Sequence, residues 1–174
     1  MSTYKLPKSA VIALTIMMSS TIVNADPVTI NVTGNIIASP CVVNAGSNTL
    51  NVSLGDIQAA SLATAGAASS VVNFDLKMTE CPSGTTSAGI VFSGTEDPDA
   101  GSNYYKNTGT AKNVAVALIE KSTGYFKGNG QNMSRNVAAD GSITYELQAK
   151  AYSVAGSAMP GTIQSAITVA ITYK

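Results

Sequence analysis

The chain has 174 residues with ten basic and ten acidic side chains, and it contains no histidine. The absence of histidine removes the usual general base and the commonest metal ligand. Sparse charge without a basic stripe argues against nucleic acid as a partner. We therefore expect no catalysis, no small-molecule substrate, no cofactor and no metal.

The first 25 residues have the composition of a secretory signal peptide. Lys5 and Lys8 precede an apolar stretch over 10–22, and small residues follow it up to Ala25. This order predicts a leader, residues 1–25, that is cleaved after Ala25. An uncleaved membrane anchor is the alternative, but the apolar stretch is short for a membrane span. Without the leader, eight basic and ten acidic side chains remain, on a chain long enough for one domain.

Directly after the leader, apolar and polar residues alternate. A period of two is typical of a β-strand with one buried face. The apolar face consists of Val28, Ile30, Val32, Gly34 and Ile36. The glycine on this face either fits a close approach to a neighbour or simply marks a bulge. Such a strand needs a sheet edge, which belongs either to its own domain or to another molecule.

Cys41 and Cys81 are the only cysteines. In an exported chain a single pair favours a disulfide, which stabilises the fold by roughly 4 kcal/mol on the chain-entropy model. A metal pair is the alternative, but two thiols without any histidine are a poor ligand set. The acidic residues over 96–99 suggest calcium, yet they lack the ligand pattern of a calcium loop, so we interpret them as a solvated turn.

The rest of the chain predicts short strands separated by turns. Alternating apolar residues indicate strands over 50–54, 72–78, 90–92, 114–118, 143–149 and 163–173. Clusters of Gly, Pro, Asp, Asn and Ser lie between them. The alanine-rich segment 62–70 forms either a short helix or a loose crossover. The pattern predicts an all-β fold, an antiparallel sandwich of immunoglobulin-like type, in a single domain over 41–174.

These residues resemble the pilin subunits assembled by the chaperone–usher pathway, in particular the minor subunits of type 1 fimbriae. The resemblance rests on the alternating N-terminal extension, the cysteine spacing, the central stretch 93–111 and the ends of the last strand. Gly161 is fourteenth from the C-terminus and Tyr173 is penultimate, which is the spacing of the family's chaperone-recognition motif. Taken separately, the two residues have plain structural interpretations, a turn and edge packing.

The resemblance implies an incomplete immunoglobulin-like sandwich that lacks its last strand, with residues 26–40 as an N-terminal donor-strand extension. A periplasmic chaperone fills the groove beside the last strand, and at an outer-membrane usher the extension of the next fimbrial subunit replaces it. The carboxylate of Lys174 is expected to bind basic chaperone residues. The groove strand is expected to use Gly161, Ile163, Ile167, Val169, Ile171 and Tyr173.

The sequence thus predicts a structural subunit, exported through the periplasm to a cell-surface fimbrium. Segments 65–69 and 161–164 resemble a tip-fibrillum adaptor more than a major rod pilin. The rod pilin stays an alternative, together with a receptor-binding adhesin module. A further alternative is a self-sufficient sandwich whose N-terminal strand joins its own sheet. The sequence does not identify the neighbouring subunits.

Overall fold

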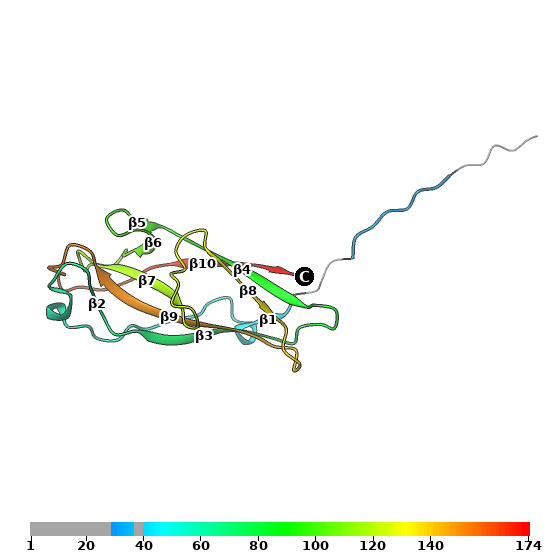
Figure 1. The fold of residues 1–174 in the computed structure, drawn as a ribbon, viewed down its shortest axis with the longest axis horizontal. Coiled ribbons are helices and arrows are strands. Elements are labelled where there is room, and N and C mark those ends of the chain that lie inside the picture. Colours follow the sequence, from blue (N-terminus) through cyan, green and yellow to red (C-terminus); the bar gives the residue numbers. More distant parts are fainter. Residues whose placement is uncertain (1–28, 37–39) are drawn as a thin grey trace, which may run out of the picture. The chain divides into compact units, whose positions relative to one another are not determined.

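A computed structural model describes residues 29–36 and 40–174, and the regular structure of these residues is almost all β (Figure 1). The expected leader, residues 1–25, lies outside the described residues. The chain divides into two units, Met1–Asn35 and Ile36–Lys174. No helix in the described ranges is long and apolar enough to span a membrane.

All helices and strands of the described residues belong to the second unit. Two short 3₁₀ helices, η1 (Asn44–Gly46) and η2 (Ala59–Leu62), accompany ten strands. The strands are β1 (Val42–Val43), β2 (Ala67–Ala68), β3 (Val72–Thr79), β4 (Ser87–Gly94), β5 (Glu96–Asp97), β6 (Gly101–Lys106), β7 (Ala115–Glu120), β8 (Asn132–Asn136), β9 (Ile143–Ser153) and β10 (Ile167–Tyr173).

The strands form two antiparallel sheets that pack as the layers of a sandwich (Figure 1). The larger sheet has the order β1-β3-β9-β7-β6-β5, with β2 paired to β9. The smaller sheet has the order β10-β4-β8, so β10 lies at its edge. The predicted all-β antiparallel sandwich is therefore confirmed.

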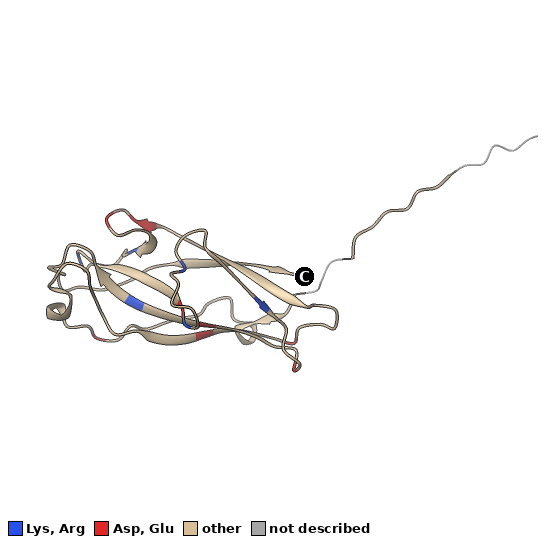
Figure 2. Cartoon of the chain, in the orientation of Figure 1, with Lys and Arg blue, Asp and Glu red and all other residues tan. Residues whose placement is uncertain are grey.

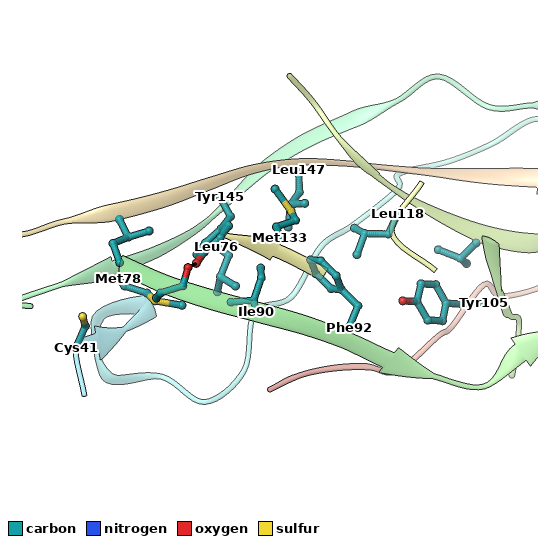
Figure 3. Packing of buried hydrophobic residues seen from close by; sticks show 13 residues of the cluster. Cys41, Leu76, Met78, Ile90, Phe92, Tyr105, Leu118, Met133, Tyr145 and Leu147 are labelled. Carbon is teal, nitrogen blue, oxygen red and sulfur yellow. Dashed lines mark hydrogen bonds between the residues drawn. The ribbon is translucent and has the colours of Figure 1, made fainter. Parts of the chain in front are cut away.

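The core between the sheets consists of the inward-facing residues of both layers (Figure 3). Every second residue of β9 is buried, as expected when successive side chains point to opposite faces of a sheet. The hydroxyl of Tyr145 on β9 donates a hydrogen bond of 2.6 Å to the carbonyl of Ala88 on β4. Burial raises the pKa of Tyr145 to about 12, so this link between the layers keeps its proton at neutral pH.

The predicted disulfide between Cys41 and Cys81 is present, with their Cα atoms 4.3 Å apart. It joins the residue before β1 to the segment that follows β3, beside the antiparallel pair of Val42 and Thr79. The bond therefore anchors the first residues of the sandwich at the edge of the larger sheet.

The predicted strand over 50–54 is wrong. Val52 and Leu54 are half-buried and Asn51 and Ser53 are exposed, but Leu50 is 39% exposed, so the side chains alternate only over 51–54. However, the segment lies in no strand. A strand is defined by its backbone partners, and no neighbouring strand of the described chain pairs with this segment.

Two further predictions need correction in their bounds. The last strand covers Ile167–Tyr173 instead of 163–173, because a neighbouring loop takes the backbone hydrogen bonds of its first part. The alanine-rich segment 62–70 contains β2 and begins at the end of η2. It is therefore a crossover with a two-residue strand and not a helix.

Candidate functional site

The edge strand β10 is the central element of the candidate site. It pairs with β4 along its whole length, from Ile167 opposite Gly94 to Tyr173 opposite Ala88. No strand of the described chain pairs with its other edge. An unpaired edge presents backbone N–H and C=O groups that bind an added strand.

The residues that the sequence assigned to this strand share one face. Residues 163, 165, 167, 169, 171 and 173 are half-buried, whereas the residues between them are exposed. Five of them pack against the buried core as partly buried apolar side chains, namely Ile163, Ile167, Val169, Ile171 and Tyr173. Their partial exposure indicates that one side of the core is uncovered at β10.

A groove of about 1160 Å³ lies beside this uncovered face. One wall is formed by residues 161–171 and the opposite wall by residues 50–57. The floor comes from both sheets and is apolar, with Phe74, Leu76, Phe92, Leu118 and Leu147 among its residues. The groove therefore resembles the space that one missing strand of the sandwich would fill.

The sequence identified only the C-terminal wall of this groove as part of a binding site. The floor residues lie on β3, β4, β7 and β9, and only the packing of the two sheets brings them together. The opposite wall did give a signal, since the alternation over 50–54 marks residues with one face toward the core. That alternation predicted a strand. In the structure, residues 50–57 line the groove but pair with no strand of the described chain.

The groove ends where residues 161–164 meet the loop 107–111. The amide of Ala111 donates to the carbonyl of Thr162 at 3.0 Å, and the amide of Thr108 donates to that of Gln164 at 2.7 Å. A Cβ atom on Gly161 would lie 2.3 Å from the backbone nitrogen of Ala111. Gly161 is therefore required by close backbone packing, independently of any role in recognition.

The other end of β10 is fixed by the C-terminal residue. The amide of Lys174 donates to the carbonyl of Ser87 at 2.9 Å. An oxygen of Lys174 in turn accepts hydrogen bonds from the amide of Thr86 at 2.7 Å and from its hydroxyl at 3.1 Å. The expected site of chaperone binding is thus held against the first residues of β4.

The N-terminal extension has the opposite character to the groove. Its described residues, 29–36, lie in no strand, and Ile30, Val32 and Ile36 are 81%, 89% and 105% exposed. A Cβ atom on Gly34 would meet nothing within 4 Å. Val28, the remaining residue of the predicted face, lies outside the described residues. The described residues of this apolar face are therefore uncovered within the extension itself.

The chemistry of the groove is that of a binding surface. Among the residues that the structure describes, Asp56 is the only ionisable one that lines the groove. Neither β4 nor β10 carries a charged side chain (Figure 2). Such a lining buries apolar side chains and satisfies backbone groups, but it offers no pair of groups for acid–base catalysis.

Comparison with known sequences gives a consistent family. Residues 30–174 match the model of the family described as fimbrial protein. The chain is 36% identical over 164 residues to the protein FimG of Escherichia coli K12, covering 94% of this chain and 95% of FimG. It is also 35% identical over 148 residues to the S-fimbrial adhesin protein SfaS of Escherichia coli, covering 83% and 84% of the two chains.

Comparison with solved structures supports the fold. The P pilus rod subunit PapA matches with a TM-score of 0.62 at 16% identity, covering 78% of this chain and all of PapA. The P pilus adaptor subunit PapF matches with a TM-score of 0.53 at 15% identity, covering 80% of this chain and all of PapF. The pilin type of sandwich is therefore the fold of this chain.

Proposed function

The chain belongs to the fimbrial protein family. From this premise we propose that it is joined to neighbouring subunits by donor-strand exchange. It is a structural subunit of cell-surface fimbriae of the chaperone–usher class, and it is not an enzyme. Residues 26–40 of one subunit act as the donor segment, and the groove beside β10 of a neighbouring subunit receives it. Insertion of a donor strand into a pilin is a known form of strand addition.

The observation that carries this proposal is that one chain carries both an open groove and an exposed apolar segment. As fully extended strands, residues 28–36 would span about 27 Å and residues 161–171 about 34 Å. Both segments repeat their apolar side chains with a period of two. The donor face is therefore long enough to cover most of the groove.

Burial of the donor face supplies the free energy of the joint. Full burial of each of Val28, Ile30, Val32 and Ile36 contributes about 1.5–3 kcal/mol, or roughly 6–12 kcal/mol before the cost of ordering the extension. Backbone hydrogen bonds to β10 add to this gain. Gly34, on the same face, adds no side chain to bury.

Delivery and position in the fimbrium complete the proposal. A periplasmic chaperone occupies the groove first and binds the C-terminal carboxylate, and an outer-membrane usher exchanges it for the next extension. The 36% identity to FimG favours a minor, adaptor-like role at the tip. A major rod pilin is the alternative, since type 1 fimbrial A chains of Escherichia coli are 29% identical.

The similarity to SfaS gives a second alternative, a receptor-binding adhesin module. The exposed extension favours the structural role, because a subunit that only ends the fimbrium needs no donor segment.

A matched pair of substitutions in the extension tests donor-strand exchange. Val32→Asp places a carboxylate on the donor face, whereas Thr33→Asp places the same charge on the polar face. We expect the first variant to be nearly absent from purified fimbriae and the second to be incorporated normally, as measured by quantitative mass spectrometry. Equal incorporation of both variants would refute the proposal.

A further inference from the structure

An aromatic cluster lies on the outer face of the larger sheet, away from the groove. Tyr104 on β6 stacks on Tyr152 of β9, with ring centroids 4.4 Å apart and planes 20° apart. Phe126, from the segment between β7 and β8, packs on Tyr104 with centroids 5.2 Å apart. All three side chains are half-buried, so part of each ring faces solvent.

In the strand register, each of two alanines of β7 lies between one lysine and one tyrosine of the neighbouring strands. Ala117 of β7 is opposite Tyr104 on one side and Lys150 on the other, and Ala115 is opposite Lys106 and Tyr152. Both alanines are almost completely buried although they point outward. The tyrosine rings therefore lean over a floor of small residues. We call Tyr104, Lys106, Phe126, Lys150 and Tyr152 the Tyr–Lys surface.

A side pocket of about 210 Å³ continues the Tyr–Lys surface. Lys106 and Ala115 line the pocket and also belong to the register around the rings. Val154, which also lines it, directly follows the end of β9 at Ser153. The other polar lining includes Asp97, Asp99, Lys112 and Asn113.

The charged groups of the side pocket are balanced and available. Asp97 uses one carboxylate oxygen to hold the pocket wall, accepting from the amides of Asp99 at 3.1 Å and Ala100 at 2.9 Å. Lys106 and Lys112 take part in none of the ion pairs of the described chain. Two carboxylates and two ammonium groups give the pocket no net charge, so it suits a neutral ligand rich in donors and acceptors.

We propose that the Tyr–Lys surface and the side pocket together bind a neutral saccharide. A pyranose ring has an apolar face of C–H groups, which packs against tyrosine, and a rim of hydroxyls, which bind carboxylate, ammonium and amide groups. The pocket is smaller than the roughly 300–1,000 Å³ of sites for drug-sized ligands. It therefore admits one sugar unit, while a second unit lies across Tyr152.

The aromatic part of this site does not take part in donor-strand exchange. The Tyr–Lys surface lies on the outer face of the larger sheet, whereas the groove opens to the core between the sheets. The side pocket adjoins the end of the groove, because Asn107, Gly109 and Ala111 of the loop 107–111 line it. A subunit that binds its neighbours through the groove still presents the Tyr–Lys surface. Sugar binding is measured without a donor segment, so its failure is distinguishable from a failure of donor-strand exchange.

Saturation-transfer NMR on the full chain tests the saccharide site directly, because it detects sugar C–H groups in contact with protein side chains. The probes are the methyl glycosides of glucose, galactose, mannose and N-acetylglucosamine at millimolar concentration. We expect at least one probe to receive saturation. We expect Tyr152→Ala and Lys106→Ala each to weaken its binding by about tenfold or more.

Matched controls separate binding from folding. Tyr125→Ala removes a tyrosine that is 70% exposed outside the cluster, and Lys77→Ala removes a lysine of β3; both should leave binding within twofold of the unsubstituted chain. Tyr152→Phe keeps the ring and should retain binding, and the exposed Lys106 is replaced without loss of packing. Absence of signal from all four probes would overturn the proposal. So would equal binding by the variants and controls, or self-association that depends on Tyr152 without sugar binding.

Discussion

The buried cluster around Glu120 gives the sharpest prediction for the stability of the sandwich. Glu120 ends β7 and is 5% exposed, and its carboxylate lies 3.0 Å from the ammonium of Lys127, which is also buried. Arg135 of β8 binds the other carboxylate oxygen. The cluster therefore connects the larger sheet, the segment after β7 and the smaller sheet.

The change Glu120→Gln removes the charge that compensates Lys127. Loss of one partner from a buried ion pair costs about 3–5 kcal/mol, because the remaining charge stays buried without compensation. The matched control is Glu146→Gln, since Glu146 forms an exposed pair with Lys121 at 2.9 Å. An exposed pair contributes about 0–1 kcal/mol, so the control should change the free energy of unfolding little.

The pH dependence of this difference follows from the Glu120 carboxyl. Burial alone would raise its pKa, but hydrogen bonds from Arg135, Lys127 and Thr123 more than offset burial and lower the pKa to about 2. A carboxyl with a lowered folded pKa stabilises the fold above its unfolded pKa of about 4.3 and loses that effect as the pH falls toward 2. The difference between the folded and the unfolded pKa corresponds to about 3 kcal/mol in the free energy of unfolding.

Urea unfolding of the full chain with its disulfide intact measures both effects. We expect Glu120→Gln to lower the free energy of unfolding by about 3–5 kcal/mol at pH 7, and the difference to shrink near pH 2. A loss at pH 7 no larger than that of Glu146→Gln would contradict the assignment of the cluster as a buried, compensated link.

Three further predictions concern close packing, the disulfide and the link between the sheets. Gly161→Ala should destabilise by about 1–3 kcal/mol through overpacking against the 107–111 loop, whereas Gly89→Ala should be tolerated in urea unfolding because its Cβ would meet nothing closer than 3.9 Å. Replacement of both Cys41 and Cys81 by serine should lower the free energy of unfolding by about 2–5 kcal/mol. An unchanged midpoint of urea unfolding would refute this. Tyr145→Phe should cost about 1 kcal/mol through loss of the bond to Ala88, and equal thermal midpoints would argue against that bond.

The long strands with a strong alternation could be predicted from the sequence, although the shorter alternation over 50–54 lies in no strand. β3 and β9 each carry several apolar residues at every second position, so their period was visible. β6 and β8 are rich in Asn, Ser and Gly, and each has too few apolar residues to reveal a period. Their pairing depends on the neighbouring strands β7 and β4.

The candidate site was predictable in its two terminal segments only. Alternation marks the faces of the extension and of β10, because each face is a local property of one segment. The groove floor requires the packing of two sheets, and the balance of charges around Glu120 requires β7 and β8 to meet. The lack of room for a side chain at Gly161 likewise arises from contact with the loop 107–111. This loop is about 50 residues earlier in the chain, so no local pattern reveals the contact.

Donor-strand insertion is tested most directly by hydrogen–deuterium exchange at the groove walls. The full chain carrying Val32→Asp, which disables its own extension, is mixed with a synthetic peptide of residues 26–40. We predict that amides over 161–171 and 50–57 exchange about tenfold more slowly with the unsubstituted peptide, and that a Val32→Asp peptide gives no protection. Unchanged exchange at both walls, or equal protection by the two peptides, would contradict the account.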